Sequence, residues 1–387
     1  MKIDTKLSHI GRSTAQSMQS VSPPLVRTST VVFPNLKVFK DSYSETVFES
    51  PRYGRSGTQT SFELQSAMAE LEEAETCIAT SCGLSAITAV LSSNSKSGAH
   101  VLINSGVYGP TEKFCTTELK KNGVECEFFD HNASVKSLIR PNTSIIFIEV
   151  PASITMELFD IREICEEAHK HNVPVACDSS WGTPIFFKPH SLGVDISIHA
   201  ATKYINGHSD AMLGLITGSY KSLEPIREWC NNYGSHVSPD SCWLALRGLR
   251  TLSIRMQHHQ RSTLKIVKKL QTLPQMLKIF YPPLSSGKQL ELWETQFTGS
   301  AGPFTVELCS CSEIEFTEFI DSLKLFSLGT SWGGFESLVM PAIPHHLRNK
   351  AVMPDEGRLV RFHIGLEDPE DLFEDIHNAL TQSGILS

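Results

Sequence analysis

Residues 173–203 read VPVACDSSWGTPIFFKPHSLGVDISIHAATK. Two apolar runs in this stretch, 173–177 and 196–199, have the length that is typical of buried strands. Asp178 directly follows the first run, and Lys203 comes shortly after the second. Ligands of open α/β sheets bind beyond the carboxyl ends of the strands, so the stretch places a carboxylate and an amine where a ligand is expected.

The same alternation of apolar runs and helical segments continues toward the N-terminus. The further runs of strand length are residues 77–80, 101–104 and 145–150. The segments with helical character are residues 64–71, 84–91, 112–121 and 161–171. Thr60 and Glu63 have the spacing of a capping box for the first helix. Alternating strands and helices predict an α/β fold with a mostly parallel sheet and helices on both faces.

We expect three parts along the chain. Residues 1–58 are rich in Ser, Thr and Pro and have little periodicity, which predicts an arm that packs on another surface. Residues 59–250 carry the alternating pattern and are expected to form the large domain. Residues 251–387 are expected to form a smaller α+β domain. Its predicted elements are helices at 253–272 and 368–383 and strands at 303–308 and 359–363.

The composition is that of an ordinary soluble protein, with 40% hydrophobic and 20% charged residues. A net charge of −8 argues against a nucleic-acid surface, which would be basic. The chain lacks both a signal-peptide core and an apolar run of about 20 residues, so we expect a cytoplasmic protein without a membrane anchor.

Neither cysteines nor histidines predict a metal site. The ten cysteines include no CxxC pair, which favours reduced thiols over a disulfide framework or a zinc site. His258-His259 and His345-His346 are adjacent pairs, and adjacent side chains diverge on a helix and alternate faces on a strand. We therefore expect no metal.

Three side chains can act on a ring-shaped cofactor, and each has an ordinary structural alternative. Burial lowers the pKa of a lysine, so Lys203 can attack a carbonyl as a neutral amine, or it is a solvated strand-end lysine. Asp178 can pair with a protonated pyridine nitrogen, which makes the ring an electron sink, or it is a turn residue. Tyr108 can stack on the ring, or it is a core tyrosine.

Other residues suit anionic groups. Gly83 precedes the predicted helix at 84–91, whose N-terminal N–H groups can bind a phosphate. Arg55 has a guanidinium fork that matches phosphate geometry, and Arg361, on a predicted strand, can bind a carboxylate in the same bidentate way.

Segments spread over nearly the whole chain resemble the Cys/Met-metabolism family of pyridoxal-phosphate enzymes, which have fold type I. These segments are YGRSGT at 53–58, SCG at 81–83, SITME at 153–157, AATKYINGHSDAM at 200–212, RGLRTL at 247–252, SWGGFESL at 331–338 and RFHIGLE at 361–367. The resemblance implies pyridoxal 5'-phosphate as cofactor, a small sulfur amino acid as substrate, and a homotetramer built from active dimers.

The resemblance also implies a role for each matching residue. Lys203 binds the cofactor covalently and, with Tyr108, is catalytic. The implied cofactor contacts are Asp178 on the pyridine nitrogen, Tyr108 on the ring, Gly83, Leu84 and Thr202 on the phosphate, and Tyr53 and Arg55 on the phosphate of the neighbouring subunit. The implied substrate contacts are Arg361 and Ser331 on the carboxylate, together with Trp332 and Tyr53.

Several departures favour the β-lyase branch of the family. Relatives that act at Cγ usually have Ser where this chain has Ala200, and commonly Asn-Pro where it has Ser153 and Ile154. Trp332 resembles the β-lyase form, or it is a packed surface-loop tryptophan. We expect elimination at Cβ of cystathionine, giving homocysteine, pyruvate and ammonia. Thr330 and Trp243 stand where β-lyases tend to have tyrosine, which can change the substrate that fits.

Other functions remain open at this point. Within the family they are a cystathionine γ-lyase or γ-synthase and a broader β-lyase that acts on cystine or cysteine conjugates. A non-catalytic cofactor-binding regulator is the alternative from another class. In the expected mechanism the freed Lys203, with Tyr108, removes the Cα proton, and Lys203 then protonates the departing thiolate.

Overall fold

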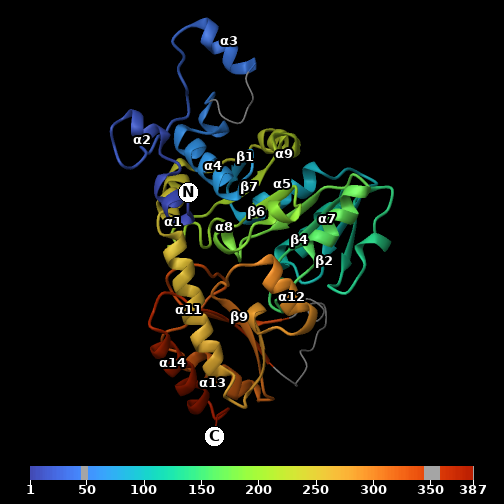
Figure 1. The fold of residues 1–387 in the computed structure, drawn as a ribbon, viewed down its shortest axis with the longest axis vertical. Coiled ribbons are helices and arrows are strands. Elements are labelled where there is room, and N and C mark those ends of the chain that lie inside the picture. The colour runs from blue at the N-terminus through green and yellow to red at the C-terminus, as the bar shows by residue number, and fades with distance from the viewer. Residues whose placement is uncertain (45–50, 344–357, 387) are drawn as a thin grey trace.

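The computed structural model describes residues 1–44, 51–343 and 358–386. His345 and His346 lie outside the described residues. Figure 1 shows two sheet-containing parts, with the long helix α11 (Leu252–Leu270) running from one to the other. Within the described ranges, no helix is both long and apolar enough to span a bilayer.

The first sheet has seven strands in the order β1-β7-β6-β5-β4-β2-β3. Its strands are β1 (Thr76–Thr80), β2 (His100–Asn104), β3 (Glu125–Phe129), β4 (Thr143–Glu149), β5 (Val175–Asp178), β6 (Ile196–His199) and β7 (Gly214–Gly218). β7 runs antiparallel to β1 and β6, and the other neighbours are parallel. The prediction of a mostly parallel sheet is confirmed.

Both faces of this sheet are buried. In β2, Val101 and Ile103 belong to one hydrophobic cluster and Leu102 belongs to another, because successive side chains point to opposite faces. Helices α5 (Gly83–Ser93) and α9 (Tyr220–Asn232) contribute to the first cluster. Helices α4 (Gln59–Glu72) and α7 (Ile161–Lys170) contribute to the second. Burial on both faces explains the apolar runs at the centres of β2 and β4.

The second sheet has five strands in the order β10-β11-β12-β9-β8. They are β8 (Met276–Phe280), β9 (Pro303–Leu308), β10 (Ser327–Leu328), β11 (Leu338–Ala342) and β12 (Arg358–His363). The sequence predicts β9 and β12 and misses the other three. Leu277 and Leu328 are exposed on β8 and β10, so these outer strands have no clear buried face.

The remaining helices complete the two parts and the arm. They are α1 (Ile3–His9), α2 (Ser13–Ser17), α3 (Leu36–Ser44), α6 (Gly109–Phe114), α8 (Thr183–Phe186), α10 (Pro239–Leu249), α12 (Gly287–Gln296), α13 (Glu313–Ser322) and α14 (Pro369–Gln382). The helix predicted at 112–121 begins earlier, as α6, and continues as a π-helix over Cys115–Leu119. Helix α3 projects from the body (Figure 1).

The predicted capping box of Thr60 and Glu63 is wrong. Helix α4 already begins at Gln59. The Thr60 hydroxyl donates to the Pro24 carbonyl at 3.0 Å, and the Glu63 carboxylate accepts from the Ser13 N–H at 3.3 Å. Both side chains therefore hold the N-terminal arm against α4 instead of capping the helix.

Substitution of Gly207 tests how tightly the segment after Lys203 packs. Its φ is +75°, and an added Cβ would lie 2.0 Å from Nη1 of Arg255. That guanidinium is buried and donates to the carbonyls of Tyr204 and Gly248. We expect Gly207→Ala to lower the free energy of unfolding by about 1–3 kcal/mol more than Gly234→Ala does. Both substitutions strain the backbone, but only Gly207 lacks space for a methyl group. Thermal unfolding of both variants measures this, and equal midpoints would contradict it.

Candidate active site

The carboxyl ends of neighbouring parallel strands bring the predicted catalytic residues to one edge of the large sheet. Asp178 is the last residue of β5, and Lys203 follows β6. Tyr108 follows β2, and its N–H donates to the Glu149 carboxylate at the end of β4 at 2.6 Å. Asp178 influences the pKa of both Lys203 and Tyr108, so the three groups share one electrostatic environment.

Lys203 is partly buried against a loop from the smaller part of the protein. Its Nζ donates to the Ser331 hydroxyl at 2.8 Å and lies 5.2 Å from the centre of the Trp332 ring. Burial, together with the positive charge of Arg361, lowers the lysine pKa to about 8, although Asp178 acts in the opposite direction. A substantial fraction of the amine is therefore neutral near physiological pH.

Asp178 is a buried carboxylate that accepts two hydrogen bonds from Ser180. The Ser180 hydroxyl and N–H donate to its Oδ1 at 2.6 and 3.0 Å. The same hydroxyl accepts from the Ala200 N–H at 2.6 Å, which links the ends of β5 and β6. Burial raises the Asp178 pKa, and the Ser180 bonds, His199 and Lys203 oppose that rise. Sequence reasoning missed Ser180, although its position two residues after a strand-end Asp is typical of such local bonds.

Strand β12 holds the loop that contacts Lys203. Arg361 Nη2 donates to the carbonyls of Thr330 and Ser331 at 2.9 and 3.1 Å. His363, on the same face of β12, accepts from the Gly333 N–H through Nε2 at 3.0 Å. Burial lowers the His363 pKa well below its usual value, which keeps Nε2 available as an acceptor. The sequence predicts Arg361 and Ser331 but not this histidine.

The phosphate-binding residues of the prediction lie at the N-terminus of α5. A Cβ on Gly83 would be 2.6 Å from the Cβ of Ala200, so this helix end approaches the segment before Lys203 closely. The N–H groups of Gly83 and Leu84 belong to the first turn, where they have no partner within the helix. The Thr202 hydroxyl donates to the Leu213 carbonyl at 3.2 Å, so it must exchange this bond to donate to a phosphate.

Tyr53 and Arg55 do not join this cluster within one chain. Tyr53 is half exposed, and Arg55 Nη1 donates to the Asn231 carbonyl at the end of α9 at 3.1 Å. Trp243 also contacts the arm, because its indole N–H donates to the Pro23 carbonyl at 3.0 Å.

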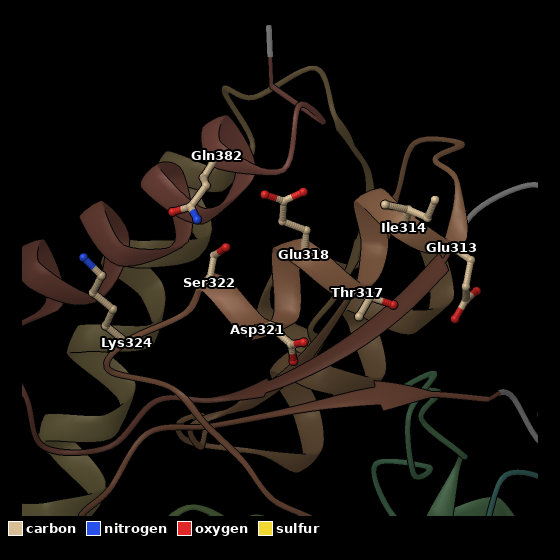
Figure 2. Close-up of a pocket in the computed structure, with 8 residues that line it drawn as sticks. All are labelled: Glu313, Ile314, Thr317, Glu318, Asp321, Ser322, Lys324 and Gln382. Carbon is tan, nitrogen blue, oxygen red and sulfur yellow. The ribbon is translucent and has the colours of Figure 1, made fainter.

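A surface hollow of about 690 Å³ lies elsewhere, on the smaller part of the protein. Figure 2 shows it over α13 and α14, with Glu318, Asp321 and Gln382 among the residues that line it. None of the predicted site residues lines this hollow.

Comparison with known proteins identifies the family of the chain. Residues 4–381 match the family described as Cys/Met metabolism PLP-dependent enzyme. The chain belongs to this family. Its curated relatives include the L-alanine/L-glutamate racemase of Wolbachia pipientis wMel, 36% identical over 99% of this chain and 98% of the relative. Cystathionine beta-lyase MetC of Escherichia coli is 37% identical over 97% of each chain.

A solved structure supports the same assignment for the fold. Cystathionine gamma-lyase from Lactobacillus plantarum, crystallised with L-serine, superposes with a TM-score of 0.89 at 29% identity and covers 99% of this chain and 100% of its own. The predicted fold type I architecture is therefore confirmed, as is pyridoxal phosphate as the cofactor of this PLP-dependent enzyme.

The residues of this chain fit pyridoxal phosphate. Lys203 offers an amine with a lowered pKa, and Asp178 offers a buried carboxylate for the pyridine nitrogen. The N-terminus of α5, held close to Ala200, offers N–H groups for the phosphate. When bound, the cofactor supplies an electron sink for negative charge at Cα of an amino acid.

The Lys203 pKa of about 8 predicts how apoenzyme takes up the cofactor. The neutral amine is the nucleophile, so the rate at which the apoenzyme reacts with pyridoxal phosphate should rise with pH and level off above about pH 8. Stopped-flow absorbance on apoenzyme with added pyridoxal phosphate measures the rate, with Lys203→Arg as the control. A rate that still rises in proportion to hydroxide between pH 9 and 10 would indicate an unperturbed lysine.

Proposed function

We propose that the protein cleaves the Cβ–S bond of cystathionine and releases homocysteine, pyruvate and ammonia. The observation that carries the proposal is the position of Lys203, held by hydrogen bonding to Ser331 and by the Trp332 ring, with Asp178 and Arg361 nearby. The likeness to cystathionine beta-lyase MetC over 97% of both chains supports cystathionine as the substrate.

Each residue has a role in the proposed reaction that its environment supports. Lys203 Nζ takes the proton from Cα and later returns a proton to the departing sulfur, for which a pKa of about 8 is suited. Arg361 binds the substrate carboxylate, because its pKa, although lowered to about 10 by burial, keeps it charged at neutral pH. Burial and Glu149 raise the Tyr108 pKa, so its phenol holds its proton, and Lys203 is the base.

The N-terminal arm is proposed to complete the site of a second copy of the chain. Phe39 and Tyr43 on α3, and Val32 before it, are exposed apolar side chains on a segment that projects from the body (Figure 1). Exposed apolar groups on such a segment are stabilised by burial against a partner. In this arrangement Tyr53 and Arg55 bind the phosphate of the neighbouring subunit.

Subunit mixing tests this arrangement. Lys203→Ala and Arg55→Ala each remove one essential group, so each variant alone should be nearly inactive. Unfolded and refolded together, they should regain about a quarter of wild-type activity, because half of the dimers are mixed and each of these contains one intact site. If Arg55 acts on its own subunit, the mixture stays inactive.

Product analysis tests the bond that is cleaved. With cystathionine, we expect pyruvate and homocysteine in equal amounts, and Arg361→Lys should lower kcat/KM by about 10²-fold or more, since a bidentate carboxylate contact is lost. Lactate dehydrogenase and mass spectrometry measure the keto acid. 2-Oxobutyrate in place of pyruvate would identify γ-cleavage, preferred turnover of cystine would identify a broader β-lyase, and no product from any sulfur amino acid would support a regulator.

A racemase is a second candidate, favoured by the Wolbachia relative that aligns over 99% of this chain. Racemisation also begins with removal of the Cα proton, but it needs a donor to return a proton to the opposite face. The protonated Tyr108 phenol, near Asp178 and Arg361, can serve as that donor. D-Alanine formed from L-alanine, and lost in Tyr108→Phe, would support this candidate, and its absence would exclude it.

A further inference from the structure

A buried histidine on β12 contacts the loop that carries Ser331 and Trp332. His363 is 1% exposed, and its Nε2 accepts from the Gly333 N–H at 3.0 Å. Among the described residues, its Nδ1 has no hydrogen-bond partner, so the shortest hydrogen bond of the ring goes to this loop. His363 has no part in the proton transfers proposed above, and its effect on the site passes through the loop.

Close packing fixes the direction of the His363 ring. The ring centre lies 5.4 Å from that of His259 and 6.0 Å from that of Tyr204. Gly302 is also close, because an added Cβ there would lie 2.9 Å from Nδ1. A ring enclosed in this way cannot turn without moving its neighbours, so Nε2 stays directed at Gly333.

The environment of His363 keeps Nε2 free of a proton. Burial lowers the pKa of this imidazole well below its usual value, and nearby positive charges act in the same direction, although the Gly334 carbonyl opposes them. Nε2 lies 3.4 Å from that carbonyl, which is farther than the 3.0 Å to the Gly333 N–H. The geometry therefore favours the tautomer in which Nε2 accepts and Nδ1 carries the proton.

Gly333 lies directly against the backbone that carries the reactive lysine. An added Cβ on Gly333 would lie 3.0 Å from the Lys203 Cβ. The two residues before it contact the lysine amine: the Ser331 hydroxyl accepts from Nζ at 2.8 Å, and the centre of the Trp332 ring lies 5.2 Å from Nζ. A shift of Gly333 therefore moves these two groups relative to the amine.

Arg361 fixes the same loop at its other end. Its Nη2 donates to the carbonyls of Thr330 and Ser331 at 2.9 and 3.1 Å. Arg361 and His363 lie two residues apart on β12, so their side chains point to the same face of the sheet. The strand therefore holds the loop by two carbonyls at one end and by the Gly333 N–H at the other.

We propose that His363 is a positioning residue for the substrate carboxylate, because its hydrogen bond to Gly333 keeps the Ser331 hydroxyl in place beside Arg361. This role rests on the proposed function, in which Arg361 binds that carboxylate with Ser331 beside it, but it does not depend on which bond is cleaved. Without the acceptor, the buried Gly333 N–H is unpaired, and the loop shifts to pair it. Ser331 then leaves the position in which it can meet the carboxylate.

Glycine binding tests this role without any bond cleavage, because glycine has the carboxylate but no group to eliminate. We expect His363→Asn to raise the dissociation constant of glycine on the holoenzyme about tenfold, the effect of one lost hydrogen bond to a charged group. His363→Gln places the same amide as many bonds from Cβ as Nε2 is, so its affinity should stay within about threefold of wild type. Isothermal titration calorimetry measures these constants. Wild-type affinity in folded His363→Asn, or equal losses in both variants, would show that the proposal is wrong.

A double-variant cycle separates positioning from general damage to the core. Ser331→Ala alone should weaken glycine binding, because it removes the hydroxyl that His363 holds in place. If His363 acts through Ser331, adding His363→Asn to Ser331→Ala should weaken binding no further than the weaker single variant. Structural damage would instead add to the loss, so full additivity would overturn the proposal.

His259→Asn is the matched control. His259 is buried and packs against the His363 ring, but its Nδ1 donates to the Ile364 carbonyl at 2.8 Å. Asparagine keeps a donor at that position, so the glycine affinity should stay within about threefold of wild type. A loss as large as that of His363→Asn would contradict a specific role for the Gly333 contact.

His363→Gln decides the question if His363→Asn does not fold, as judged by its thermal midpoint. Folded His363→Gln that binds glycine about tenfold more weakly would overturn the proposal. Wild-type affinity would support it, because the amide retains the acceptor but not the ring. Wild-type protein that binds glycine but releases no homocysteine from cystathionine would overturn the proposed substrate alone, since the glycine constants still report on His363.

Discussion

The Asp178 carboxylate is a charged group buried at the end of an apolar sheet, and the other features of the site follow from the cost of burying that charge. Burial favours the protonated form of this carboxyl, which cannot stabilise the positive charge of a pyridinium. Ser180, His199 and Lys203 oppose this tendency from adjacent strand ends. The parallel arrangement of β5 and β6 makes this possible, because parallel strands deliver their carboxyl ends to the same edge.

Much of the fold and the reactive residues could be predicted from local patterns. β6 and β9 have the predicted bounds, and nearly all of their residues are buried. Asp178, Lys203 and Arg361 could be identified because polar side chains at or near such strands are unusual. Ser180 escaped prediction as a site residue although its bonds to Asp178 are local. His363 escaped prediction because its contact with Gly333 joins segments 30 positions apart.

The contacts of the N-terminal arm show that residues of the types expected for one interaction can make a different one. Thr60 and Glu63 have the residue types of a capping box, yet both bind the arm at Pro24 and Ser13. Trp243, expected to alter the substrate pocket, donates to Pro23 in the same arm. A sequence pattern records that a side chain has a polar partner, but the identity of the partner is decided by tertiary structure.

The loop at 330–334 has a consequence for directed evolution. Gly333 has a φ of +88°, and a Cβ there would lie 2.9 Å from the Tyr204 backbone nitrogen and 3.0 Å from the Lys203 Cβ. Any larger residue would push against the backbone that carries the reactive lysine. Thr330 is exposed, and it contributes its main-chain carbonyl to Arg361. Libraries that seek new substrates can therefore randomise Thr330 freely while Gly333 stays invariant, since diversity at one end of the loop leaves the lysine undisturbed.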